Sequence, residues 1–303
     1  MLNDKKYYIK IPHFEVICVK LCRLKMIESS TLYIVATPIG NLLDISPRAI
    51  EILKHADKIY AEDTRHSKTL MQSHAIMTDM QALHEHNEQQ QVAQILQRLK
   101  AGESIAIISD AGTPLISDPG FFIVQAVRQA GWKVSPVPGA CAAIAALSAS
   151  GLASDRFTFN GFIPAKKEAR RKFLATFLYS EQTNIFYESP HRILVSLADM
   201  ISVFGEERRI CFARELTKQF ETIKLASLSE ILAFATNDPN QQKGEIVLIL
   251  EKSTAMVCSE KQALSTLKLL MEELPASQAS KIAAKLTGLK KKQLYQLILD
   301  HNL

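Results

Sequence analysis

Residues 109–120 are Ser109-Asp110-Ala111-Gly112-Thr113-Pro114-Leu115-Ile116-Ser117-Asp118-Pro119-Gly120, and the architecture can be worked out from this segment in both directions. It follows an apolar run, Ser104–Ile108, that is typical of a buried strand. It precedes a helical pattern, Phe121–Val127, for which Asp118 is the expected cap and Pro119 the expected first turn. We therefore predict a loop at the carboxyl end of a parallel strand, where open α/β sheets bind ligands. A well-formed strand-to-helix turn without a ligand is the alternative.

Size and composition favour a folded chain with more than one domain. A chain of 303 residues, 47% of them apolar, can bury two cores of ordinary size and a small third one. The five cysteines are scattered and complete no zinc pattern, so we expect free thiols, no metal and a reducing cytoplasm. No uninterrupted apolar run is long enough to cross a membrane, so we expect no membrane partner.

The net charge of +5 is concentrated at the N-terminus. Residues 1–25 contain six Lys/Arg and two Asp/Glu, a net +4, which leaves +1 for the remaining chain. Any nucleic-acid surface must therefore come from local basic patches. Residues 1–30 fit the rest of the pattern poorly, and Met26 stands shortly before the first clear strand. We expect an N-terminal extension, disordered or not native; a basic arm that contacts RNA is the alternative.

From residue 31 onward, strand and helix patterns alternate. We predict an N-terminal α/β domain over residues 31–150, a second α/β domain over 151–253 and a helical tail over 254–303 that resembles a helix-turn-helix bundle. In the second domain, Arg209–Ala213 and Phe220–Ala226 are predicted to pair antiparallel because the connection between them is short. The other predicted strands are Thr31–Ala36, Lys58–Ala61, Val134–Val137, Phe157–Phe162, Thr183–Tyr187 and Gly244–Glu251.

Three further segments of the first domain follow predicted strands or join a strand to a helix. Thr37-Pro38-Ile39-Gly40-Asn41 lacks the G-x-G-x-x-G dinucleotide motif, and the chain has no phosphate-binding P-loop, which argues against NAD and ATP and favours a cofactor without phosphates. Glu62–His66 concentrates ionisable groups, although Asp63 could simply cap the next helix. Pro138–Ala142 could admit a flat ligand or a carboxylate at a helix start, or serve close packing alone.

The second domain contains three comparable segments. In Tyr187–Arg192, Glu188 and His191 are potential proton acceptors, whereas Ser189 and Pro190 have a sufficient structural role at a helix start. Arg214–Lys218 and Lys243–Glu245 could bind substrate or form an ion-pair network on a solvated face.

Two basic patches could contact the phosphate backbone of a nucleic acid, or could simply keep the protein soluble. The first surrounds the single acid Glu168 and consists of Lys166, Lys167, Arg170, Arg171 and Lys172. The second, Lys290–Lys292, begins the last predicted helix.

Taken in order, these segments are distinctive: Leu32–Leu42, Ala61–Arg65, Ser109–Gly120, Phe186–Arg192, Ala213–Lys218 and Lys243–Glu245. From about residue 30 to the end, the chain resembles the tetrapyrrole methylase superfamily, and within it the enzymes that methylate small-subunit ribosomal RNA. The resemblance implies a two-lobed α/β fold with a cleft for S-adenosylmethionine between the lobes, followed by the helical tail. It also implies methyl transfer to the ribose 2′-hydroxyl of a cytidine in the decoding region of 16S rRNA. Relatives with this fold are homodimers.

The resemblance also suggests site residues. By position, the cofactor contacts would be Pro38, Asp110, Ala111, Gly112, Thr113, Ile116, Ser117, Ala142, Tyr187, Ala213 and Gly244. Removing the proton from the 2′-hydroxyl needs a nearby base, and the candidates are Asp63, Glu188, His191 and Lys218. RNA contacts would come from Arg65, Lys166, Lys167, Arg170, Arg171, Arg192 and Lys290–Lys292.

Two other functions compete with this interpretation. One is methylation of a tetrapyrrole ring carbon, but such relatives carry a Gly-Asp-Pro segment where this chain has Asp110-Ala111-Gly112-Thr113, and a basic tail has no obvious use with a macrocycle. The other is a non-enzymatic nucleic-acid-binding protein that works through residues 259–303. Thermal stabilisation by S-adenosylmethionine would distinguish a methylase from a protein that only binds nucleic acid.

Overall fold

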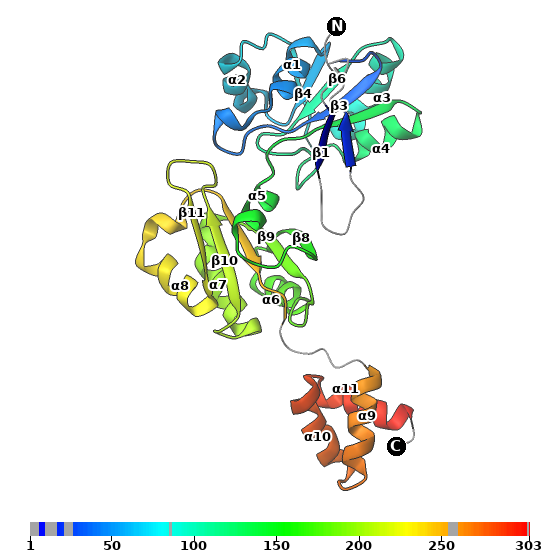
Figure 1. Ribbon diagram of the computed structural model, residues 1–303, viewed down its shortest axis with the longest axis vertical. Helices are drawn as coiled ribbons and strands as arrows, with labels where there is room; N and C mark the ends of the chain where they lie inside the picture. The colour runs from blue at the N-terminus through cyan, green and yellow to red at the C-terminus, as the bar shows by residue number, and fades with distance from the viewer. Residues whose placement is uncertain (1–5, 10–16, 21–26, 85–86, 254–259, 302) are drawn as a thin grey trace. The chain divides into compact units, whose positions relative to one another are not determined.

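The structure is a computed structural model that describes residues 6–9, 17–20, 27–84, 87–253, 260–301 and 303 (Figure 1). It divides into two units, Met1–Cys141 and Ala142–Leu303. Strands β1 (Lys6–Ile9) and β2 (Ile17–Lys20) form an antiparallel pair. The other residues of the predicted extension up to residue 26 lie outside the described residues. That the extension is disordered or not native stays a prediction.

The first unit is built on a five-stranded parallel sheet. Its order is β5 (Met80–Ala82), β4 (Lys58–Ala61), β6 (Ile105–Ile108), β3 (Thr31–Val35) and β7 (Lys133–Val137). Every neighbouring pair is parallel. The carboxyl ends of β3, β4, β6 and β7 therefore meet at one edge, as the sequence predicted.

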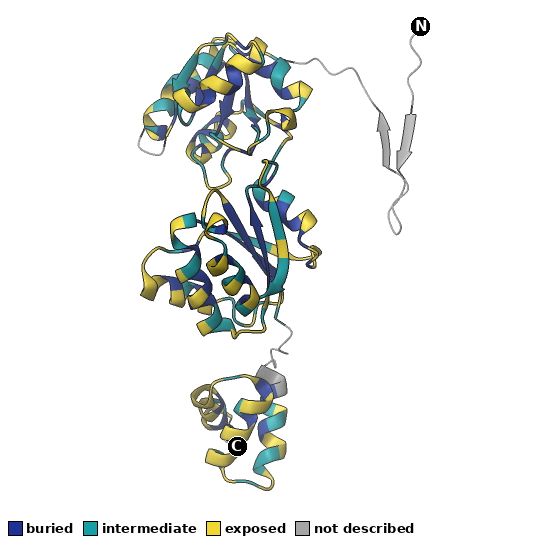
Figure 2. Ribbon diagram, turned by 90° about the vertical axis from the view of Figure 1, so that its left-hand side faces the viewer, coloured by how far each residue is buried: buried dark blue, intermediate teal, exposed yellow. Residues whose placement is uncertain are grey.

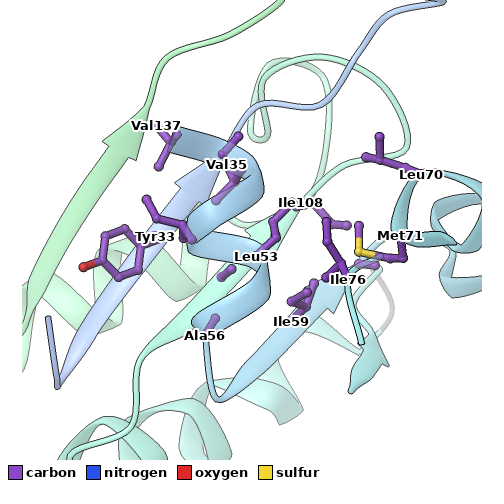
Figure 3. Close-up of a cluster of buried hydrophobic side chains, with 14 of the residues drawn as sticks. Tyr33, Val35, Leu53, Ala56, Ile59, Leu70, Met71, Ile76, Ile108 and Val137 are labelled. Carbon is purple, nitrogen blue, oxygen red and sulfur yellow. The ribbon is translucent and has the colours of Figure 1, made fainter. Parts of the chain in front are cut away.

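Helices cover both faces of this sheet because the residues of each strand alternate between the faces. Ala106 and Ile108 pack with α1 (Pro47–His55) and α2 (Thr64–Ser73) in the core of Figure 3. Ile105 and Ile107 pack on the other face with α3 (Glu88–Lys100) and α4 (Phe121–Gln129). A short 3-10 helix, η1 (Leu42–Asp44), follows β3.

The start of α4 differs from the prediction. Its N-cap is Gly120, at φ 127°, and no side chain of the segment itself caps it. Asp118 is not the cap, and Pro119 lies before the helix rather than in its first turn. The carboxylate of Glu88, at the start of α3, takes the cap position instead. The expected cap was wrong because local spacing does not reveal a partner from a distant helix.

The second unit contains a mixed sheet in the order β11 (Thr222–Ser227), β10 (Arg209–Arg214), β12 (Ile246–Leu250), β9 (Thr183–Glu188) and β8 (Phe157–Phe162). The predicted antiparallel pairing of β10 with β11 is confirmed, and β8 pairs parallel with β9. One face packs on α6 (Lys167–Ala175), α7 (Ile193–Phe204) and α8 (Leu228–Asn237), and two 3-10 helices, η2 (Pro190–Arg192) and η3 (Pro239–Gln242), precede α7 and β12. Helix α5 (Ala142–Ala149) contacts β9 and β12, so the division falls before this helix.

The tail is a three-helix bundle of α9 (Glu260–Met271), α10 (Ala276–Thr287) and α11 (Lys291–Asp300). Its core contains Leu267, Ala283, Leu294 and Ile298. Gly288 ends α10 in the left-handed conformation, at φ 72°, which glycine adopts without steric cost. Figure 2 shows the resulting alternation of buried and exposed faces on these helices. Across the described part of the chain, no helix has the length and apolar character needed to cross a bilayer.

Candidate active site

Three predicted segments of the first unit meet at the carboxyl edge of its sheet. Thr37, after β3, exchanges backbone hydrogen bonds with Gly112, after β6, at 2.8 and 3.1 Å. The Thr113 hydroxyl donates to the carbonyl of Ala140, in the turn after β7, at 2.9 Å. The start of the loop 109–120 is thus hydrogen-bonded to the segments that follow β3 and β7.

The small residues of these segments allow the backbones to approach closely. Gly112 has φ 83°, and a Cβ there would lie 3.3 Å from the Ile39 side chain. A Cβ on Gly139 would lie 2.8 Å from the Cβ of Ala36, so this glycine allows close packing. Close packing was the alternative to ligand binding that the sequence offered for Pro138–Ala142. The middle of the loop carries strain, since Leu115 and Ser117 have φ of 72° and 69°. Ile116 and Ser117 are exposed, and Pro38 and Asp110 are half-buried, so all four can be reached by a ligand.

Carboxylates gather beside this loop. Asp110 Oδ1 accepts a hydrogen bond from the backbone N–H of Asp63 at 3.0 Å, and the N–H of Asp110 points to Glu62 Oε2 at 3.5 Å. Burial and the negative charges of Glu62 and Asp110 raise the pKa of Asp118 to about 6, although a hydrogen bond with Ser109 acts in the opposite direction. Glu62 and Asp118 belong to segments that were predicted to lie at this edge, but neither was among the predicted site residues, and Asp118 was expected to act as a helix cap. The edge is suited to a ligand that carries positive charge. No cluster of His, Cys, Asp or Glu among the described residues could hold a metal ion.

Asp63 caps α2 and is paired with Arg65. Its Oδ1 accepts from the Arg65 backbone N–H at 2.8 Å, and its Oδ2 accepts from the guanidinium at 2.7 Å. These hydrogen bonds hold the pKa of Asp63 well below its ordinary value, which makes it a weak base at neutral pH. The side chain of Arg65 is 89% exposed, so its remaining donors still face solvent.

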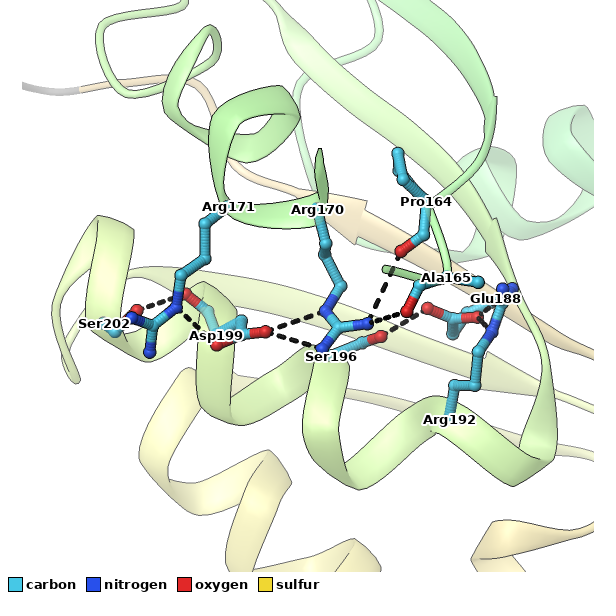
Figure 4. A network of polar contacts seen from close by, with 9 residues as sticks. All are labelled: Pro164, Ala165, Arg170, Arg171, Glu188, Arg192, Ser196, Asp199 and Ser202. Atoms are coloured by element: carbon cyan, nitrogen blue, oxygen red, sulfur yellow. Dashed lines mark hydrogen bonds and ion pairs between the residues drawn. The ribbon is translucent and has the colours of Figure 1, made fainter. Parts of the chain in front are cut away.

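Glu188 of the second unit is buried and fully engaged (Figure 4). It accepts hydrogen bonds from the Ser189 N–H at 2.6 Å, from Arg192 at 2.7 Å and from the Ser196 hydroxyl. Arg192 is in turn committed to Glu188 and only partly exposed. Glu188 therefore fixes the turn between β9 and α7, and the structure does not support it as a proton acceptor.

Arg170 is also structural. It is 4% exposed, pairs with Asp199 at 2.7 Å and donates to the carbonyl of Ala165 at 2.8 Å (Figure 4). Its RNA-contact assignment was wrong, because a buried and paired guanidinium cannot face a phosphate. Arg171 shares Asp199 but keeps an exposed side chain, and Lys166 and Lys167 are exposed.

Lys218 forms the centre of an ion-pair cluster. Its Nζ lies 2.8 Å from both Glu215 Oε1 and Glu245 Oε2. Burial favours the neutral amine, but the hydrogen bonds and charges of the two glutamates outweigh it and raise the pKa of Lys218. A charged lysine is not a proton acceptor. His191, in η2, is exposed, and no ion pair joins it to another described residue.

Two of the predicted cofactor contacts of the second unit lie in one row across its sheet. Ala213 on β10 and Tyr187 on β9 both pair with Val247 on the intervening strand β12, so the three side chains lie on the same sheet face. The Tyr187 ring packs against Phe159 and Phe162, at centroid distances of 4.8 and 5.5 Å. Gly244, at φ 79°, lies before β12, where a Cβ would clash with Glu215.

Lysines on two helices of the tail are exposed. Lys290–Lys292 lie at the start of α11, as predicted, and α10 adds Lys281 and Lys285, which sequence analysis did not single out. None of these five lysines forms an ion pair with another described residue, in contrast to Arg170, Arg192 and Lys218 of the second unit.

Solved structures share the two-sheet architecture. Uroporphyrin-III-C-methyltransferase from Thermus thermophilus matches with a TM-score of 0.53 at 18% identity, over 74% of this chain and 94% of that chain. Diphthine synthase matches with a TM-score of 0.55 at 14% identity, over 74% and 90%. These similarities define the fold as that of the tetrapyrrole methylases. The model of Tetrapyrrole (Corrin/Porphyrin) Methylases matches residues 31–232, and that of the RsmI C-terminal HTH domain matches residues 259–302.

Relatives that match this chain along nearly all of their length show which family of tetrapyrrole methylases it belongs to. The chain is 51% identical to Ribosomal RNA small subunit methyltransferase I of Pseudomonas aeruginosa over 276 residues, which is 90% of this chain and 98% of that protein. It is 53% identical to the protein of the same name from Haemophilus influenzae, over 89% of this chain and 96% of that protein. The chain therefore belongs to the ribosomal RNA small subunit methyltransferase I family of tetrapyrrole methylases. S-adenosylmethionine is the methyl donor of this family.

Proposed function

We propose that this protein transfers a methyl group from S-adenosylmethionine to the ribose 2′-hydroxyl of a cytidine in the decoding region of 16S rRNA. The observation that carries the proposal is identity of about one half, along nine-tenths of the chain, to enzymes named for small-subunit ribosomal RNA. The similarity to a tetrapyrrole methyltransferase is far lower, at 18% identity, and that protein matches only 74% of the chain. This difference disfavours the macrocycle alternative.

For the cofactor, we propose contacts by Pro38, Asp110–Thr113, Ile116 and Ser117 in the first unit. The edge that carries these residues suits a cation without phosphates, because the loops are small and close-packed and carboxylates lie beside them. S-adenosylmethionine carries an ammonium and a sulfonium group and no phosphate. From the second unit, we propose contacts by Ala142, Tyr187, Ala213 and Gly244.

When bound, the cofactor supplies a methyl group already activated by the sulfonium. The protein has to orient the ribose so that its 2′-oxygen is in line with the methyl–sulfur bond, and to accept the hydroxyl proton. Of the four predicted proton acceptors, Asp63 is a weak base because its pKa is lowered, and Lys218 is already protonated. Glu188 is buried and paired. We therefore retain His191, through an imidazole nitrogen, as the proposed acceptor.

For the RNA, we propose backbone contacts by exposed cations. They are Arg65 in the first unit, Lys166, Lys167 and Arg171 in the second, and Lys281, Lys285 and Lys290–Lys292 in the tail. The tail lysines have no competing acidic partner among the described residues, so their charge is available to phosphates. We also propose that the protein acts in the cytoplasm as a homodimer on the small ribosomal subunit.

The decisive experiment incubates the purified protein with tritiated S-adenosylmethionine and small subunits from a strain that lacks the enzyme. We expect label on a single ribose of 16S rRNA, and a His191→Ala variant should bind the cofactor normally but transfer the methyl group at least a hundredfold more slowly. Label on a base, or no label on any RNA, would reject the proposed reaction. Absence of thermal stabilisation by S-adenosylmethionine would favour the protein that only binds nucleic acid.

A further inference from the structure

Glu88 caps a helix to which it does not belong. It is the first residue of α3 and is 4% exposed. Its Oε1 accepts hydrogen bonds from the backbone N–H groups of Phe122 at 2.7 Å, Gly120 at 3.1 Å and Ile123 at 3.3 Å. The first N–H groups of a helix lack partners within the helix, and the helix dipole favours a negative charge there. Glu88 thus provides the cap that the sequence around α4 lacks.

The three N–H groups lie where the loop 109–120 ends. The loop is held at its start by the hydrogen bonds of Thr37 and Thr113. Its second half contains two non-glycine residues in the left-handed region, Leu115 and Ser117. Such a conformation persists only where the surroundings hold it. Glu88 is the side chain that fixes the far end of this strained segment.

The position of Glu88 is itself fixed by the sheet. The neighbouring Asn87 accepts a hydrogen bond from the N–H of His84 at 2.9 Å and donates to the carbonyl of Ala82 at 3.1 Å. Ala82 is the last residue of β5. The carboxylate is therefore placed by the edge strand of the sheet, and the loop that follows β6 is held through it.

We propose that Glu88 is a positioning residue for methyl transfer, which holds residues 115–120 in the conformation that binds S-adenosylmethionine. The inference rests on the proposed cofactor contacts at Ile116 and Ser117. Within the described part of the chain, the hydrogen bonds of the Glu88 side chain go to backbone groups of Gly120, Phe122 and Ile123, and Glu88 is not assigned a role in the chemistry. Its effect should fall on cofactor affinity and leave the rate at saturation almost unchanged.

The test compares Glu88→Ala with Glu88→Gln, which keeps an oxygen that can accept the three hydrogen bonds. We expect Glu88→Ala to raise the Kd and the KM for S-adenosylmethionine at least tenfold, with kcat reduced less than threefold. Glu88→Gln should restore both constants to within threefold of the natural protein. Hydrogen exchange of the amides of residues 120–123 should accelerate in Glu88→Ala. If Glu88→Ala does not fold, Glu88→Asp, whose shorter side chain cannot reach all three groups, is judged by the same criteria.

Ile95→Val provides the matched control, since Ile95 is fully buried on the same helix and contributes to its core. Unchanged cofactor affinity in Glu88→Ala would overturn the proposal, and so would an equal loss of affinity in Ile95→Val. A separate variant, Asp110→Asn, tests the cofactor site itself. If Asp110→Asn binds the cofactor normally while Glu88→Ala does not, the proposed contact at Asp110 fails and the positioning role of Glu88 stands.

Discussion

Replacement of Asp118 by asparagine should stabilise the protein at neutral pH. The carboxyl group is half-buried on the loop that follows β6, and burial together with the charges of Glu62 and Asp110 raises its pKa from 3.8 to about 6. Near pH 7.5 the group is charged in both the folded and the unfolded chain, and the folded chain has to hold that charge beside two other carboxylates. Asparagine has nearly the same shape and carries no charge.

The size of the effect follows from the pKa. An increase from 3.8 to about 6 corresponds to about 3 kcal/mol, because each pKa unit is worth about 1.4 kcal/mol. Partial exposure of the side chain screens the charge, so we expect about 1–2 kcal/mol. A raised pKa gives an acid a stabilising contribution that is complete below its unfolded pKa and is lost as the pH rises through its folded pKa. The advantage of Asp118→Asn should therefore be absent below pH 4, grow between pH 4 and 6, and be constant above about pH 7.

Urea denaturation of both proteins from pH 4 to 8 measures this difference directly. Titrating groups that do not interact with Asp118 are common to both chains and cancel in the comparison, whereas those of Glu62 and Asp110 are part of the measured difference. A difference that does not depend on pH, or an asparagine variant that is less stable at pH 7.5, would refute the reasoning. The same variant should bind S-adenosylmethionine more weakly, since it removes negative charge near a proposed cationic ligand. Gains in stability with losses in affinity are typical of functional sites.

Three other outcomes are expected. Gly244→Ala should lower stability by about 1–3 kcal/mol, measured by urea denaturation, because its Cβ would meet the Glu215 side chain and its φ is 79°. Arg170→Ala should lower the free energy of unfolding by about 3–5 kcal/mol, because Asp199 loses its buried partner. In the same assay, replacement of the exposed Lys167 by alanine should change the free energy of unfolding by less than about 0.5 kcal/mol. Replacing Lys290–Lys292 with alanine should reduce the slope of log affinity for 16S rRNA against log salt by about 2, and an unchanged slope would remove these lysines from the interface. The control removes three exposed lysines of the first unit: Lys54, Lys68 and Lys100.

The sequence by itself determined the alternation of strands and helices and the loops between them. Lys58–Ala61 and Phe157–Phe162 were predicted to the residue, because short runs of strand-forming residues lie between clear turns. Helix α2 was anticipated only through Asp63 as its possible cap, which the structure confirms, and strand β5 was missed. In α2 only Leu70 and Met71 give an apolar face, and β5 has three residues, so neither shows a usable period. The position of the 109–120 loop at the carboxyl edge also followed from the sequence, since strand polarity in a parallel sheet leaves no alternative.

Only the tertiary structure decided what the charged side chains do. Asp118 was expected to cap α4, but Glu88 does so from the start of α3. Arg170 and Glu188 were candidates for RNA contact and proton transfer, and both are buried in ion pairs with partners on or near α7. The physical reason is that the protonation state and availability of a charge depend on which distant groups surround it. A pattern along the chain shows the type of a residue and its place on a strand or helix. Which distant side chains surround that residue is decided only when the chain folds.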